Sequence, residues 1–144
     1  MSNISTLKSL TQTTFDSVEG YRKAIDKAED RSLKDALSDR MQKRENTLEK
    51  LNTTLSQQGE DTITSASTSA SAHQTWINIA DSFSNGNEAA AERVEEGEDY
   101  IAGKFRDALE DEDLTGEVRS VVEQACNEIQ QAEKFSDMLE REYA

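Results

Sequence analysis

Helical periodicity is clearest in residues 4–28, which read ISTLKSLTQTTFDSVEGYRKAIDKA. Apolar residues recur there at steps of three and four, and this spacing places them on one face of a helix. The same spacing occurs in residues 91–108, AERVEEGEDYIAGKFRDA, except that Glu98 stands where an apolar residue is expected. A charge directed into a helical core is costly unless it meets a partner or a metal ion. Glu98 is therefore the first candidate for a functional residue.

The composition favours a single all-α domain over residues 1–144. The chain has no proline and only six glycines, so few residues interrupt helices. Apolar and polar residues do not alternate over any long run, as they would in half-buried β-strands. A chain of 144 residues is also long enough to bury a core of its own.

The helical pattern is broken into segments whose order predicts a topology. We expect long helices at about residues 3–29, 32–58, 88–109 and 116–142. The first two are joined by so short a link that they must be antiparallel. Residues 59–71, GEDTITSASTSAS, predict a crossover linker as long as the bundle, and a short extra helix is expected at 73–84. One long connection between the second and third long helices is typical of the ferritin-like four-helix bundle.

Charge restricts the classes of partner and the location. The net charge is −14, from 30 acidic and 16 basic residues, and such a field repels nucleic acids and anionic membranes. The first ten residues, MSNISTLKSL, are too polar for a secretory signal, and no apolar run is long enough to span a membrane. The single cysteine, Cys126, excludes an internal disulfide and fits a reducing compartment. We therefore expect a cytoplasmic protein with neither a nucleic acid nor a membrane as its partner.

Several carboxylates lie on or beside the apolar faces and suggest a metal site. A ferritin-like di-iron centre takes a Glu from each of two helices and Glu-x-x-His from each of the other two. The candidate ligands are Glu19, Glu95, Glu98 and Glu128, with Glu49 or Glu133 completing the set. Gln131 stands where Glu128 would need its histidine, and the only histidine, His73, lies outside the four long helices. A divalent metal such as iron would therefore depend on carboxylates alone.

Arg44 competes with a metal for these carboxylates. It falls between Leu37 and Leu51 at steps of seven, so its guanidinium should point into the bundle. Arginine stays charged at any relevant pH and can pair with a carboxylate through two parallel hydrogen bonds. A structural charge pair of Arg44 with Glu98, or with Glu19, would balance the buried charges without a metal. The hydroxyl of Tyr21, on the apolar face of the first helix, is expected to complete a polar contact.

Four motifs occur in a fixed order along nearly the whole chain. They are Asp16-Ser-Val-Glu19-Gly20-Tyr21, Arg44 with the later Leu48 and Leu51, His73-x-x-Trp76, and Glu95-Glu96-Gly97-Glu98-Asp99. Together they resemble the bacterial ferritin-like family catalogued as domain of unknown function 2383. The resemblance implies a ferritin-like four-helix bundle that is often tied to bacterial stress responses and has no established reaction. The family frequently has a histidine late in the fourth helix, where this chain has Ala132-Glu133, and this departure weakens a metal site that needs imidazole.

These observations lead to two functional hypotheses. The first is a non-enzymatic bundle with a stress-related binding or protective role, whose inward charges are paired through Arg44. The second is a carboxylate-rich protein that binds iron or another divalent cation, as an oxidase or for storage. A homodimer is a further hypothesis, because Phe83, Tyr100 or Phe105 could lie at a contact between chains. The sequence leaves the substrate and the protein partner open.

Overall fold

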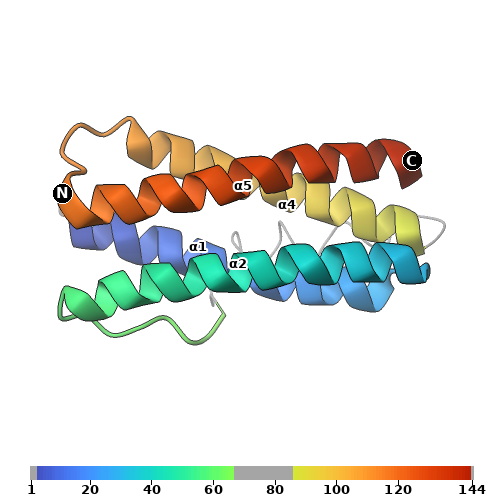
Figure 1. Ribbon diagram of the computed structural model, residues 1–144, viewed down its shortest axis with the longest axis horizontal. Coiled ribbons are helices and arrows are strands. Elements are labelled where there is room, and N and C mark those ends of the chain that lie inside the picture. The colour runs from blue at the N-terminus through green and yellow to red at the C-terminus, as the bar shows by residue number, and fades with distance from the viewer. Residues whose placement is uncertain (1–2, 67–85, 144) are drawn as a thin grey trace.

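The computed structural model describes residues 3–66 and 86–143, and this part of the chain forms an all-α four-helix bundle (Figure 1). The helices are α1 (Asn3–Lys27), α2 (Arg31–Gln57), α4 (Gly86–Leu109) and α5 (Gly116–Tyr143). The four long helices expected from the sequence are thus confirmed, with small differences at their ends. The short helix expected at 73–84 and the last part of the predicted 59–71 linker lie outside the described residues.

The helix directions show how the two helical hairpins are joined. The backbone N–H groups of Glu29 and Asp30, between α1 and α2, donate to Oδ1 of Asn87 at 2.7 and 3.0 Å. The start of α4 therefore lies beside the start of α2, while α2 ends at the opposite end of the bundle (Figure 1). The two helix ends that the long linker joins therefore lie at opposite ends of the bundle, as the predicted long crossover requires.

A glycine ends α2 as its sequence predicts. Gly59 has φ +81°, in the left-handed region that glycine adopts without a steric penalty. Its N–H donates to the carbonyl of Ser56 at 3.0 Å, and the N–H of Glu60 donates to the carbonyl of Leu55 at 3.0 Å. This pair of bonds is a Schellman motif, which satisfies two of the last helical carbonyls and turns the chain away from the helix axis.

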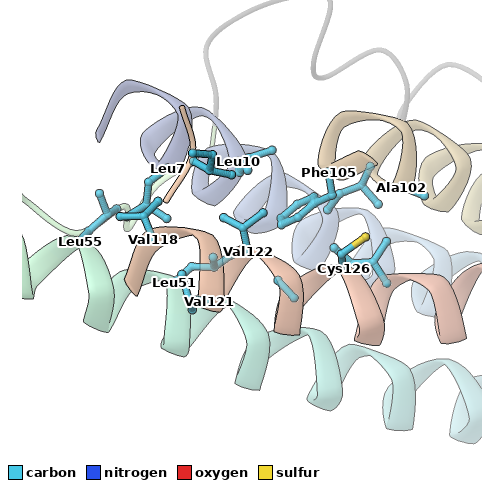
Figure 2. Packing of buried hydrophobic residues seen from close by; sticks show 14 residues of the cluster. Leu7, Leu10, Leu51, Leu55, Ala102, Phe105, Val118, Val121, Val122 and Cys126 are labelled. Carbon is cyan, nitrogen blue, oxygen red and sulfur yellow. The ribbon is translucent and has the colours of Figure 1, made fainter. Parts of the chain in front are cut away.

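Buried apolar side chains form two separate clusters. The first consists of Leu7, Leu10, Leu51, Leu55, Ile101, Ala102, Phe105, Leu114, Val118, Val121, Val122, Ala125, Cys126 and Ile129. Figure 2 shows this cluster filling the space between the helices, with side chains from all four of them. The second consists of Tyr21, Ala24, Ala28, Leu33, Leu37, Ala90, Ala91, Val94 and Leu139. Each large apolar side chain in them contributes about 1.5–3 kcal/mol to folding.

A layer of buried polar side chains lies between the two clusters. Its members are Ser17, Arg40, Arg44, Thr47, Glu98 and the partly buried Glu128. On α2 the layer falls between Leu37 of the second cluster and Leu51 of the first. On α4, Glu98 falls between Val94 and Ile101 in the same way. The ionisable groups are thus held at mid-bundle with apolar core on both sides.

The negative charge is concentrated on one hairpin. Residues 3–57 contain 10 basic and 9 acidic residues, whereas residues 86–143 contain 6 basic and 18 acidic ones. The surface formed by α4 and α5 is therefore strongly acidic, and that of α1 and α2 is nearly neutral. None of the helices in the described ranges is both long and apolar enough to cross a membrane.

The aromatic residues considered for a contact between chains are differently placed. Phe105 is fully buried in the first cluster, so its side chain cannot contribute to such a contact. Tyr100 is partly exposed, and the Lys104 ammonium lies 5.6 Å from the centre of its ring. Phe83 lies outside the described residues. A homodimer therefore stays a prediction that has lost one of its three proposed contacts.

Candidate functional site

Arg44 of α2 and Glu98 of α4 form the centre of the polar layer. Arg44 Nη1 donates to Glu98 Oε1 at 2.9 Å, and Nη2 donates to Oε2 at 2.7 Å. Both side chains are 0% exposed. Two parallel bonds between a guanidinium and a carboxylate are among the strongest charged contacts in proteins. The structure therefore brings the two residues of the predicted charge pair together in the interior.

Two side chains of α1 complete this pair. Tyr21 Oη donates to Glu98 Oε2 at 2.8 Å, and Arg44 Nη1 donates to Ser17 Oγ at 3.0 Å. The guanidinium carbon of Arg44 also lies 5.8 Å from the centre of the Tyr21 ring, within the range of a cation–π contact. The Tyr21 hydroxyl thus holds the carboxylate that binds Arg44, and α1 is tied to both α2 and α4.

Glu128 of α5 accepts the remaining donors of Arg44. Arg44 Nε donates to Glu128 Oε1 at 2.8 Å, and Arg44 Nη2 donates to Oε2 at 3.3 Å. Thr47 Oγ1 also donates to Oε1 at 2.8 Å, and Arg40 Nη2 donates to Oε2 at 3.3 Å. A guanidinium has five N–H groups, and all five of Arg44 are used, shared among Ser17, Glu98 and Glu128.

The charges in this network balance. Arg40 and Arg44 supply two positive charges, and Glu98 and Glu128 supply two negative ones. Burial would lower the pKa of Arg44, but the charges of Glu98 and Glu128 outweigh burial and raise that pKa. Burial raises the pKa of Tyr21 well above its ordinary value, and the negative charge of Glu98 raises it further. Arg44 therefore stays ionised and Tyr21 stays neutral over the physiological pH range.

The donor set at the centre of the bundle does not fit a di-metal site. The guanidinium of Arg44 occupies the space between the carboxylates of Glu98 and Glu128, and both carboxylates already accept its hydrogen bonds. A divalent cation bound there would have to displace a buried positive charge. Removing one partner of a buried ion pair typically costs about 3–5 kcal/mol. The centre is therefore built around an arginine.

The four predicted metal ligands do not meet at one point. Glu98 and Glu128 reach Arg44, as described above. Glu19 lies on the outer side of α1, where its carboxylate is 3.4 Å from Nε of Arg22. Glu95 lies in a different group, with Asp99 of α4 and Asp137 of α5. The four ligands predicted from the sequence therefore lie in three separate places, and only Glu98 and Glu128 face the centre.

A group of acidic side chains lies between α4 and α5. One carboxylate oxygen from each of Glu95, Asp99 and Asp137 lies within 4.8 Å of the others. Burial raises the pKa of Glu95 to about 8, together with a hydrogen bond to Asp99 and the charge of Asp99. Carboxylates this close repel each other unless one of them holds a proton or a cation lies between them. A proton held by Glu95 in its hydrogen bond to Asp99 would relieve this repulsion, in agreement with the raised pKa.

Glu133 of α5 extends this acidic group. It forms a hydrogen bond with Asp99 and an ion pair with Arg106 of α4. Burial and the Asp99 bond raise the pKa of Glu133, while Arg106 opposes the rise. A second triad, Glu92, Glu95 and Glu96, lies along α4 itself. In the described part of the chain, these acidic groups therefore lie on α4 and between α4 and α5, away from the Arg44 centre.

Three members of the network, Ser17, Arg40 and Thr47, are absent from the sequence-based expectation. A signal for two of them exists, because Arg40 and Thr47 lie four residues before and three residues after Arg44. They therefore continue the helix face that Arg44 occupies. Ser17 lies four residues before Tyr21, on the same face of α1. Serine and threonine also occur at such positions in cores without a polar network. Their spacing alone therefore does not show that Ser17 and Thr47 belong to one.

Comparison of the sequence with known families assigns most of the chain to one of them. A family model described as "Domain of unknown function (DUF2383)" matches residues 2–111. The chain belongs to this family. The DUF2383 match includes Tyr21, Arg44 and Glu98, and it ends before α5, which carries Glu128. No curated protein and no solved structure matches the chain.

Proposed function

We propose that this DUF2383 chain is a non-enzymatic ferritin-like helical bundle with a stress-related binding or protective role. In this proposal the central charges hold the four helices in register and perform no reaction. The observation that carries it is the complete use of the Arg44 guanidinium, whose five N–H groups all bond within the protein.

The helix directions support the ferritin-like part of this proposal. Ferritin-like bundles consist of two antiparallel hairpins joined by one long crossover. Here α2 and α4 run in the same direction, so the end of α2 and the start of α4 lie at opposite ends of the bundle (Figure 1). A bundle with short loops throughout would have α4 antiparallel to α2.

The environment of the charges supports a structural role over a catalytic one. Catalysis requires that a substrate reach the reactive groups, normally through a pocket. Arg44, Glu98 and Tyr21 are each 0% exposed, and the hydrogen bonds between them occupy the groups that could act. Glu128 is the most exposed charge of the network, with 16% of its side chain exposed and both oxygens bonded, and 10% of the Arg40 side chain is exposed.

The binding part of this role is supported by charge. The acidic surface of α4 and α5 attracts basic surfaces of other proteins at low ionic strength. The stress-related part of the proposal comes only from what the resemblance of the sequence motifs implies. The same surface weakens binding to nucleic acids and anionic lipids, since both repel it.

Metal binding is the measurement that tests this proposal. The purified full chain is dialysed against Fe²⁺, Mn²⁺ or Zn²⁺, and the bound metal is counted by elemental analysis. We expect less than one tightly bound equivalent per chain. Stoichiometric tight binding that the Glu98→Gln variant loses, while circular dichroism shows that it stays folded, would contradict the proposal.

The alternative function is that of a carboxylate-rich metal protein. It is favoured by one observation, the acidic group of Glu95, Asp99 and Asp137 between α4 and α5. Carboxylate oxygens are the ligands that hard divalent cations prefer. This alternative predicts that Glu95→Gln abolishes metal uptake and that Glu98→Gln leaves it unchanged. The two variants in the same dialysis experiment therefore distinguish a site at the seam from a site at the bundle centre.

A further inference from the structure

Residues 60–66 form a strap that turns back from the end of α2 and runs along the outside of the bundle, in green in Figure 1. Its first residue, Glu60, is tied to α2 by the Schellman motif. From residue 61 to residue 66, no backbone hydrogen bond joins the strap to the described helices. The strap therefore depends on side chains for its attachment.

Asn52 of α2 holds the middle of the strap through both backbone groups of Ile63. The N–H of Ile63 donates to Asn52 Oδ1 at 2.7 Å, and Asn52 Nδ2 donates to the carbonyl of Ile63 at 3.0 Å. A side-chain amide carries an acceptor beside a donor, and here the two match the backbone groups of a single residue. Both bonds are partly buried, so they are stronger than they would be in water.

The other polar attachments of the strap are exposed to solvent. Gln12 Nε2 donates to the carbonyl of Ser65 at 2.9 Å, and Lys8 Nζ lies 2.6 Å from Glu60 Oε1. Exposed ion pairs contribute little to stability, because water screens the charges and two long side chains must be ordered. Among the polar contacts, the two bonds of Asn52 therefore hold the strap most firmly.

The side chain of Ile63 is the apolar attachment of the strap. It is partly buried and packs against the first cluster. The preceding residue, Thr62, lines an open groove of about 590 Å³ on α1 and α2, together with Asn52, Phe15 and Leu48. The strap thus covers part of the first cluster at the edge of this groove.

We propose that the strap opens as a unit while the four helices stay folded, and that Asn52 is the residue that keeps it closed. A segment opens locally when it has few buried apolar contacts and few protected hydrogen bonds. The strap has one large apolar side chain and one pair of partly buried bonds, whereas each helix has its own ladder of backbone bonds. Opening removes Ile63 from the first cluster and exposes the apolar surface beneath it beside the groove. This device goes beyond the proposed function and does not depend on it.

Amide hydrogen exchange of the full chain, followed by nuclear magnetic resonance, tests the opening. The backbone amide of Ile63 reports on the strap, and that of Leu51, inside α2, reports on the bundle. We expect the protection factor of Ile63 to be at least about tenfold smaller than that of Leu51 and nearly independent of urea at low concentration, whereas urea should lower that of Leu51. Equal protection with equal urea dependence would overturn the proposal, because the strap would then open only when the bundle unfolds. An Ile63 amide without protection would also overturn it, because the strap would then not be closed.

Asn52→Ala tests the part played by Asn52, and Asn46→Ala is its matched control. Asn46 is an exposed residue of the same helix, and its side chain bonds to Gln42. In Asn52→Ala we expect the Ile63 amide to exchange about tenfold faster and the Ile63 methyl signals to move toward their positions in an unfolded chain. Asn46→Ala should leave both unchanged, and thermal melting followed by circular dichroism verifies that both variants fold. Equal effects of the two variants, or unchanged Ile63 methyl signals in Asn52→Ala, would overturn the role of Asn52.

Discussion

Arg44 and Glu98 face each other through two parallel hydrogen bonds of 2.9 and 2.7 Å, and neither side chain is exposed to solvent. A buried ion pair adds little net stability over an apolar pair, because removing both charges from water is expensive. The pair instead favours one particular arrangement of the four helices over others. Arg44 of α2 bonds to α1, α4 and α5 at once, so any shift of one helix along another leaves a charge unpaired in the core.

The first prediction concerns the loss of one charge from this pair. Glu98→Gln keeps the shape of the side chain but leaves Arg44 with less compensation in the core. We expect the free energy of unfolding to fall by about 3 kcal/mol. Urea unfolding followed by circular dichroism measures it. The matched variant Glu49→Gln, at an exposed position on α2, should change stability by less than about 0.5 kcal/mol. Equal effects of the two variants would show that breaking the buried pair costs no more stability than removing an exposed charge.

The second prediction concerns the tyrosine that supports Glu98. The chain has three tyrosines, and burial together with Glu98 raises the pKa of Tyr21 well above its ordinary value. In an alkaline absorbance titration, we expect Tyr21 to ionise in a delayed step, only as the protein unfolds. Tyr21→Phe should remove that delayed step and destabilise the fold by about 2 kcal/mol, because a charged acceptor loses its donor. A delayed step that persists in Tyr21→Phe would assign it to another tyrosine.

The third prediction is a pH dependence caused by Glu95. Folding raises its pKa to about 8, compared with about 4.3 in an unfolded chain. The folded state therefore binds the proton more tightly, so this stabilisation is complete below about pH 4 and is lost as the pH rises to about 8. Glu95→Gln should reduce the loss of stability between pH 5 and pH 8.5, by about 1 kcal/mol after allowance for solvent screening.

Denaturation at several pH values measures this difference. Glu142→Gln, an exposed change of the same charge on α5, serves as the control and should leave the pH profile unchanged. A profile of Glu95→Gln that parallels the wild type would mean that Glu95 titrates normally in the folded protein.

The fold could be predicted because helical periodicity and helix ends are local properties of the sequence. The spacing of apolar residues located all four described helices, and Gly59 marked the end of α2. The polar 59–71 segment indicated a crossover because a chain of that composition has little to bury. Which helices pack against each other depends on contacts between distant residues, and periodicity does not contain that information.

The site could be predicted only in part, for the same reason. Spacing showed that Arg44 and Glu98 point inward, but it could not show that Glu128, and not Glu19, is the second carboxylate. The choice depends on the relative rotation and translation of helices, since a shift of one residue turns a side chain by about 100°. Glu95, only three residues before Glu98, accordingly faces α5 and joins a different group.

A double-mutant cycle between Arg44 and Glu98 tests the central claim most directly. The free energy of unfolding is measured for the wild type, Arg44→Met, Glu98→Gln and the double variant at one pH. If the two groups neutralise each other in the core, the double variant should be more stable than the sum of the single effects implies, by about 2 kcal/mol or more. Single effects that add to within about 0.5 kcal/mol would show that the two charges are independent and would contradict the account.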